Sequence, residues 1–181
     1  MTDRKADVAR IQLAVSVIVR NIRSETVERY VANRAAVPFE DFHDGILPFI
    51  YRSQPVRISD LAQMMQLETT TVSRRLAGLD RQGIIRRDPH PIDGRSTLVS
   101  LSPKGEAIFN ATSKSWLATF NEVLEDWDDG AVIAFSAYLL VFSKAFAALV
   151  QRVSQEALAR QADSWNRNAD GSGDDSTPKR L

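Results

Sequence analysis

Residues 61–101 constrain the fold of this chain more than any other stretch. Apolar residues recur there in two short runs at helical spacing, which predicts two short helices joined by a tight turn. In the second run, Val72, Leu76 and Leu79 are four and three residues apart, so they share one face of a helix over about residues 69–81. Gly83 suits the left-handed position that ends such a helix.

A β-hairpin with a long loop is predicted to follow the two helices. Residues 84–88 and 97–101 have the character of paired strands. The eight residues between them contain two prolines and an Asp-Gly turn signal. Because a tight hairpin needs only about two loop residues, this loop must project from the sheet. Two helices followed by a projecting hairpin loop form a winged helix-turn-helix.

The composition excludes several kinds of functional site. The chain has no cysteine, which excludes disulfides and thiolate metal sites, and its two histidines are too few for a histidine metal cluster. We find no nucleophile elbow, phosphate loop or paired carboxylates in an apolar setting, so we predict neither enzymatic activity nor a cofactor. The 23 basic and 23 acidic residues cancel, but residues 52–104 hold nine basic against five acidic side chains. Any attraction to nucleic acid must therefore arise in this region.

The flanking segments are predicted to be helices. Residues 6–36 carry one apolar stripe and indicate a single helix. Residues 39–54 indicate a weaker helix, with a kink or break near Pro48 because proline removes a backbone donor. A long helix over residues 103–127 is followed, after an Asp-Asp-Gly break, by a last helix that ends near Ala162. With its small hairpin, the chain is predicted to be mainly α.

The second helix of the central pair has an outer face suited to the DNA major groove. If Val72 and its partners point inward, Thr70, Ser73 and Arg74 point outward. Hydroxyls bond bases or phosphates, and a guanidinium can make a bidentate contact with guanine that is worth about 1–3 kcal/mol of discrimination. Arg75 lies beside this face and suits a phosphate, or an ion pair with Asp80 or Glu68. A solvated face with ordinary charges is the alternative, and the hairpin downstream favours DNA.

The hairpin loop supplies a second predicted contact. Arg95 at its tip can reach the adjacent minor groove, where A·T-rich DNA concentrates negative potential. Asp93 would be repelled by phosphate, so we expect it to fix the loop, either by pairing with an arginine or by capping the turn at Gly94. We expect His90 to be a solvated loop residue. The predicted DNA-binding residues are Thr69, Thr70, Thr71, Ser73, Arg74, Arg75 and Arg95.

Over about 45 residues this region resembles the winged helix-turn-helix of the MarR (multiple antibiotic resistance regulator) family. The matching features are Leu61-Ala62, Thr71-Val72-Ser73-Arg74, Leu79, Gly83, Arg87, Asp93-Gly94-Arg95, Val99-Ser100-Leu101 and Lys104-Gly105. The flanking helices match the family in layout rather than in sequence. The resemblance implies an N-terminal dimerisation helix, a winged DNA-binding domain, C-terminal dimerisation helices and a disordered tail, at residues 1–36, 37–101, 102–162 and 163–181.

A homodimer is the assembly that the resemblance implies. The last two helices fit it, because they carry more large apolar side chains than one thin bundle needs. These residues are Trp116, Phe120, Trp127, Phe135, Leu139, Phe142 and Phe146. An intramolecular helical core is the alternative. A two-fold dimer would bind double-stranded DNA at a pseudo-palindromic operator, with half-sites about one helical turn or a multiple apart.

Two departures from the family bear on the site. Glu68 stands where a capping serine is usual, so we expect Thr69 to cap the helix. Residues 39–54 lack the smooth apolar helix of the family, in which ligands such as small aromatic acids bind between the dimer helices and the winged domain. The ligand-binding candidates are therefore His43, Asp44, Tyr51 and Arg52. The alternative places His43 and Asp44 on a solvated face.

The sequence thus predicts a dimeric, sequence-specific DNA-binding regulator of transcription, a repressor released by a small-molecule effector. The alternative is a dimeric protein-interaction module whose winged domain no longer binds DNA. The first residues lack a signal core, and the sequence contains no long uncharged apolar run that could span a membrane. We therefore expect a cytoplasmic protein.

Overall fold

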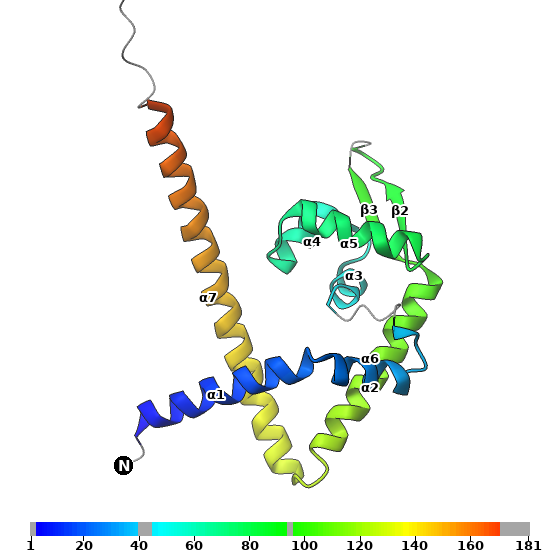
Figure 1. Cartoon of the computed structure of the whole chain (residues 1–181), viewed down its shortest axis with the longest axis vertical. Helices are drawn as coiled ribbons and strands as arrows, with labels where there is room; N and C mark the ends of the chain where they lie inside the picture. The colour runs from blue at the N-terminus through cyan, green and yellow to red at the C-terminus, as the bar shows by residue number, and fades with distance from the viewer. Residues whose placement is uncertain (1–2, 40–44, 94–95, 171–181) are drawn as a thin grey trace, which may run out of the picture. The chain divides into compact units, whose positions relative to one another are not determined.

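The computed structural model describes residues 3–39, 45–93 and 96–170 (Figure 1). The described chain is mainly α with one small sheet, which confirms the predicted fold class. Its elements are α1 (Arg4–Ile22), α2 (Glu25–Arg34), α3 (Leu47–Ser53), β1 (Val56–Arg57), α4 (Ile58–Met65), α5 (Thr69–Arg81), β2 (Ile85–Pro89), β3 (Thr97–Leu101), α6 (Pro103–Val123) and α7 (Asp129–Asp170). They form two compact units, Met1–Val123 and Leu124–Leu181.

The helix pair α4 and α5 is held by the apolar face that the sequence indicates. Val72, Leu76 and Leu79 of α5 are almost completely buried, at 0%, 0% and 1% exposure. They pack in one core with residues from α3, α4, the sheet and α6, among them Ile50, Leu61 and Val99. Burying each such side chain, rather than leaving it exposed to water, stabilises the folded chain by about 1.5–3 kcal/mol. The helix pair is therefore fixed against the sheet by the part of its sequence that faces inward.

The end of α5 sets the direction in which β2 leaves. Gly83 has a φ of 68°, the left-handed conformation that glycine adopts without strain. The amide of Gly83 donates to the carbonyl of Asp80 at 2.9 Å, and the amide of Ile84 donates to the carbonyl of Leu79 at 2.9 Å. These two bonds form a Schellman motif, and buried Leu79 and Ile84 supply its apolar contact.

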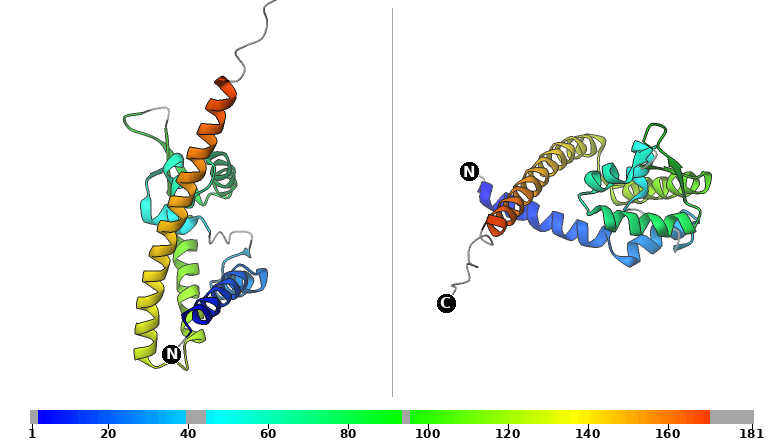
Figure 2. Two further views of the ribbon diagram at one scale, coloured as in Figure 1. Left: turned by 90° about the vertical axis from the view of Figure 1, so that its left-hand side faces the viewer. Right: turned by 90° about the horizontal axis from the view of Figure 1, so that it is seen from above.

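The sheet has three antiparallel strands in the order β1-β3-β2. Ile85 pairs with Leu101 at the buried end, and Pro89 pairs with Thr97 where the hairpin loop begins. The β2–β3 hairpin extends away from the helix pair in each view (Figure 2). The loop that joins its strands therefore starts at the free end of the sheet.

Helix α6 begins as predicted, with Pro103 as its first residue. The Ser102 hydroxyl accepts a hydrogen bond from the amide of Gly105 at 3.1 Å and caps the helix. The buried face of α6 consists of Gly105, Ile108, Thr112 and Ser115. The aromatic stripe, which the sequence analysis assigned to a dimer interface, is offset from this face, since Phe120 is 45% exposed. The helix also ends at Val123, before the predicted residue 127.

The N-terminal region departs from the single helix predicted over residues 6–36. The chain breaks at Ser24, whose side chain accepts a hydrogen bond from the amide of Val27 and starts α2. Pro48 does not kink a longer helix, because it lies in the first turn of the short helix α3, where its missing N–H costs nothing. Residues 40–44, which include part of the predicted second helix, lie outside the described residues.

Helix α7 extends to Asp170, past Ala162, where the sequence predicts a disordered tail to begin. Residues 171–181 of that tail lie outside the described residues. The segment Asp129–Ala157 of α7 has a mean hydropathy of 1.9, so by length and composition it is apolar enough to cross a membrane. Lys144 interrupts this segment, so it is not the uncharged apolar run that the sequence analysis looked for, and its length and composition alone are weak evidence for a membrane span. In the described part of α7, none of the residues of this apolar window is buried, although the Phe135 ring lies 5.3 Å from the Trp127 ring.

Candidate nucleic-acid interface

The outer face of α5 presents the side chains predicted to contact DNA. Thr69, Thr70, Arg74 and Arg75 are exposed, and Thr71 and Ser73 are half-buried. Within the described residues, neither arginine forms a hydrogen bond or an ion pair. Both guanidinium groups are therefore available to an external acceptor.

The ion pair with Asp80 or Glu68 that was the alternative for Arg75 is not found among the described residues. The Asp80 carboxylate lies 3.0 Å from Nε of Arg87, which ties the end of α5 to β2. Thr69 does not cap α5, because it is the first helical residue and Glu68 occupies the cap position. The Glu68 side chain makes no capping hydrogen bond either. The first turn of α5 is therefore left without a side-chain cap.

The base of the hairpin loop is held by short-range hydrogen bonds. The amide of Ser96 donates to the carbonyl of Asp93 at 2.9 Å, and the Ser96 hydroxyl donates to the Asp93 carboxylate. The amide of His90 donates to the carbonyl of Ser96 at 2.9 Å. These contacts support the loop-fixing role predicted for Asp93. Gly94 and Arg95, the predicted turn and minor-groove residues, lie outside the described residues.

His90 is not the solvated loop residue that the sequence suggested. It is half-buried, and Nε2 of its ring lies 3.0 Å from Nη2 of Arg57. Its other ring nitrogen, Nδ1, lies 3.1 Å from the amide nitrogen of Asp93 and 3.3 Å from that of Ile92. The ring therefore links the hairpin loop to the start of α4.

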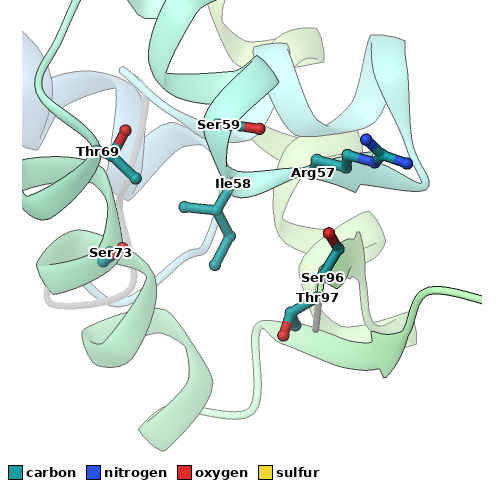
Figure 3. Close-up of a pocket in the computed structure, with 7 residues that line it drawn as sticks. All are labelled: Arg57, Ile58, Ser59, Thr69, Ser73, Ser96 and Thr97. Atoms are coloured by element: carbon teal, nitrogen blue, oxygen red, sulfur yellow. The ribbon is translucent and has the colours of Figure 1, made fainter. Parts of the chain in front are cut away.

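A pocket of about 240 Å³ lies between the helix pair and the base of the hairpin. Its lining residues are Arg57, Ile58, Ser59, Thr69, Ser73, Ser96 and Thr97. Figure 3 shows the α5 residues on one side and the β3 end on the other. Sequence reasoning found Thr69 and Ser73 but missed the others. The missed residues come from two other segments, 57–59 and 96–97, and no periodicity in the sequence connects these segments with α5.

Of the predicted ligand-binding residues, Tyr51 and Arg52 lie in the described part of the chain, next to each other on α3. The Tyr51 ring stacks on the Phe109 ring, with centroids 4.1 Å apart and planes at 27°, so one of its faces is already covered. Arg52 is exposed in the last turn of α3. His43 and Asp44 lie outside the described residues. No group of three or more His, Asp or Glu side chains in the described ranges is placed to hold a metal ion.

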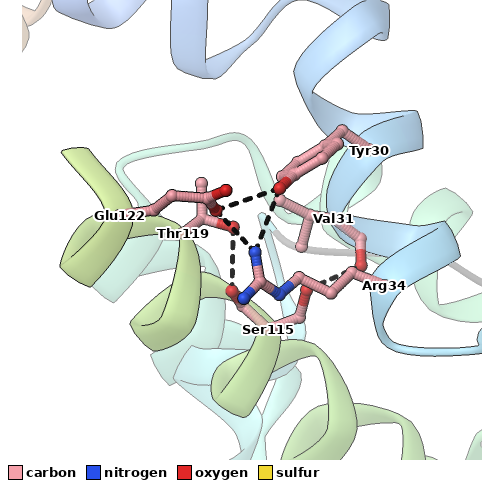
Figure 4. Close-up of polar contacts among 6 residues, drawn as sticks. All are labelled: Tyr30, Val31, Arg34, Ser115, Thr119 and Glu122. Atoms are coloured by element: carbon pink, nitrogen blue, oxygen red, sulfur yellow. Dashed lines mark hydrogen bonds and ion pairs between the residues drawn. The ribbon is translucent and has the colours of Figure 1, made fainter.

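A polar cluster that the sequence did not indicate joins α2 to α6 (Figure 4). Arg34 Nη1 lies 2.6 Å from the Glu122 carboxylate, and the Tyr30 hydroxyl donates to the same carboxylate at 3.0 Å. The hydrogen bond from Arg34, followed by that from Tyr30, lowers the pKa of Glu122, and the bond to Glu122 raises the pKa of Arg34. Beneath them, the buried Ser115 hydroxyl donates to the carbonyl of Val31 at 2.9 Å.

Comparison with known proteins points to one family. Residues 45–97 match the model of the MarR family. A 92-residue stretch is 29% identical to YxaD, an uncharacterised helix-turn-helix transcriptional regulator of Bacillus subtilis, and it covers 51% of this chain and 64% of that regulator. The matches to curated relatives span 42% to 64% of their lengths.

Solved structures share the fold over most of the chain. The MarR-family transcription regulator SP03579 superposes with a TM-score of 0.66 at 25% identity, covering 81% of this chain and 95% of that one. Streptococcus pneumoniae FabT in complex with DNA superposes with a TM-score of 0.65 at 19% identity, covering 78% and 99%. The family match runs from α3 to the start of β3, so residues 45–97 carry a winged helix-turn-helix of the MarR-family type.

Proposed function

We propose that this protein is a DNA-binding regulator of transcription that reads the major groove with α5. The observation that carries the proposal is the outer face of α5, where two exposed arginines without described partners stand beside exposed threonines. Hydroxyls and guanidinium groups are the donors that base edges and phosphates accept. The structure of FabT, which has the same fold, is of a complex with DNA.

We further propose that the protein acts as a homodimer in the cytoplasm. Helix α1 buries no residue, and α7 exposes Phe135, Phe142 and Phe146 at 40%, 41% and 55%. Soluble monomers rarely expose apolar patches of this extent, and a second copy of the chain would cover them. A dimer with two-fold symmetry would bind a pseudo-palindromic operator.

Regulation by a small ligand is the third part of the proposal. A ligand that prefers a dimer with misspaced recognition helices would lower operator affinity by shifting the population of states. The protein would then be a repressor that the ligand releases from DNA. Tyr51 and Arg52 on α3, with His43 and Asp44, are the proposed contacts.

Fluorescence anisotropy of the purified protein tests the proposed DNA binding. The probe is the DNA upstream of the protein's own gene, with a scrambled duplex as the control, over a range of salt concentrations. We expect preference for the upstream DNA, with log affinity falling linearly as log salt rises. Binding without sequence preference or salt dependence would instead indicate the protein-interaction module.

A further inference from the structure

We propose that the pocket beneath the hairpin binds a phosphate of the DNA backbone, with Arg57 as its cationic residue. This inference rests on the proposed DNA-binding function and adds a contact that the sequence motif does not contain. The residues that line the pocket are Arg57, Ile58, Ser59, Thr69, Ser73, Ser96 and Thr97, so one arginine and five hydroxyl-bearing residues surround one apolar side chain. None of these lining residues carries a carboxylate, although Asp60 and Asp93 accept hydrogen bonds from two of their hydroxyls.

The lining suits an anion. A guanidinium only donates hydrogen bonds, and a hydroxyl can donate one while rotating to suit its acceptor. Phosphate oxygens accept hydrogen bonds and carry the charge that arginine binds most strongly. A cation would meet the positive charge of Arg57, and an apolar ligand would offer no acceptor to the hydroxyls of Thr69, Ser73 and Thr97. The hydroxyls of Ser59 and Ser96 already donate to the carboxylates of Asp60 and Asp93. Of the common ligand classes, the arrangement therefore favours a phosphate.

The contacts of Arg57 leave it in need of an acceptor. Its Nη2 lies 3.0 Å from Nε2 of His90, while two backbone amides approach Nδ1 of the same ring. A neutral imidazole has only one nitrogen that accepts, so it cannot satisfy Arg57 and the amides of Ile92 and Asp93 together. A phosphate oxygen would accept from Arg57 and leave the ring nitrogen to the loop amides.

The position of the pocket identifies the phosphate as one of the DNA backbone. Thr69 and Ser73 of α5 form one side, and Ser96 and Thr97 at the base of the hairpin form the other (Figure 3). In the proposed complex α5 enters the major groove, and the hairpin loop reaches the adjacent minor groove. A sugar–phosphate strand separates these two grooves. In the proposed complex, this strand passes between the two sides of the pocket.

Mixed-sequence DNA is a suitable probe, because backbone contacts are largely independent of sequence. Anisotropy of a labelled mixed-sequence duplex is measured over a salt series for the full chain and for Arg57→Gln. We expect Arg57→Gln to weaken binding about tenfold at low salt and to reduce the slope of log affinity against log salt by about one for each copy of the chain on the DNA. Lys114→Gln, which removes an exposed charge on α6, is the control and should stay within about twofold of the unsubstituted protein.

Two further variants guard against a folding defect. Arg57→Lys keeps the charge and should restore most of the salt slope, with less of the affinity because lysine lacks the fork of donors. Thr97→Val removes one pocket hydroxyl from β3 and should weaken binding about threefold without changing the slope. Circular dichroism verifies that each variant is folded.

Each contrary result has its own meaning. If the unsubstituted protein binds DNA and Arg57→Gln binds equally well with the same slope, the pocket does not hold a DNA phosphate. If inorganic phosphate raises the melting temperature of the unsubstituted protein but not of Arg57→Gln, while both bind DNA alike, the pocket takes free phosphate and the proposal is overturned. If the unsubstituted protein binds no DNA at any salt concentration, the proposed function itself has failed.

Discussion

At the scale of single residues, the neighbours Arg74 and Arg75 separate two kinds of DNA contact. They lie about 100° apart around α5, so only one can point directly into the groove. We expect Arg74→Ala to reduce the preference for the operator over scrambled DNA about tenfold to a hundredfold, and Arg75→Ala to weaken binding to both by a similar factor. Anisotropy with an operator selected from a random library measures both ratios. Equal losses on the two duplexes for Arg74→Ala would remove it from base recognition.

Gly105 is a residue whose small size the fold requires. A Cβ atom at this position would lie 2.0 Å from the carbonyl oxygen of Ile84, which is backbone and cannot rotate away. We expect Gly105→Ala to destabilise the protein by at least about 1–3 kcal/mol in urea unfolding.

The matched control is Gly78→Ala, also within a helix. Nothing lies within 4 Å of its Cβ position, so this substitution should stabilise α5 by up to about 1 kcal/mol. Unfolding is compared at one protein concentration, because dimerisation would contribute to stability. Equal effects of the two substitutions would contradict the close approach of α6 to Ile84.

At the scale of elements, the Arg34–Glu122 pair makes the attachment of α2 to α6 sensitive to acid. Its bonds lower the pKa of Glu122, so the stabilisation is present above the ordinary glutamate value of 4.5 and is lost as pH falls through the lower folded value. We expect Glu122→Gln to lower the melting temperature at pH 7 and to have progressively less effect below pH 4.5. Glu125→Gln is the control. A gap between Glu122→Gln and the unsubstituted protein that stays constant from pH 7 to acid would contradict this role.

The elements that the sequence predicted well are those whose signals are local. Helix α5 has a four-and-three apolar spacing and a terminal glycine, and both the helix and its left-handed end are found as expected. The break at Ser24 was missed because the apolar stripe of α1 is not a core stripe, since α1 buries no residue within the chain. A periodic pattern does not show whether its apolar face packs within the chain or against a second molecule.

The pocket could not be predicted for a different reason. Arg57 and Thr97 are distant in sequence and are brought close by the antiparallel pairing of β1 with β3, which sets Arg57 beside Leu98. The link from Arg57 to His90 follows from the same register and from the loop geometry, neither of which has a sequence signal. The sequence therefore indicates which side chains of α5 point outward, and only the tertiary fold shows what lies beside them.

At the scale of the whole molecule, one unit carries the proposed DNA-binding residues and the other carries the apolar surface of the proposed dimer. Met1–Val123 contains the winged helix-turn-helix, and Leu124–Leu181 contains α7 with its apolar surface. DNA binding by one copy alone would use a single recognition helix. A dimer holds two of them at a fixed separation, so the second contact forms without a further loss of translational freedom. Disrupting the dimer should therefore weaken operator binding although no DNA contact changes.

Phe142→Glu on α7 tests this coupling. Phe142 and Phe146 stack with centroids 6.1 Å apart on the stripe expected to meet a second copy. We expect Phe142→Glu to convert the dimer to monomers in sedimentation equilibrium, because a carboxylate in an apolar interface is left unpaired, and to weaken operator binding at least about tenfold. Leu140→Glu makes a similar change about 200° around the helix and should leave both the dimer and the affinity intact.

If both variants remain dimeric, the stripe through Phe142 is not the interface. If the unsubstituted protein requires detergent to stay in solution, α7 is a membrane segment and the proposed assembly is wrong.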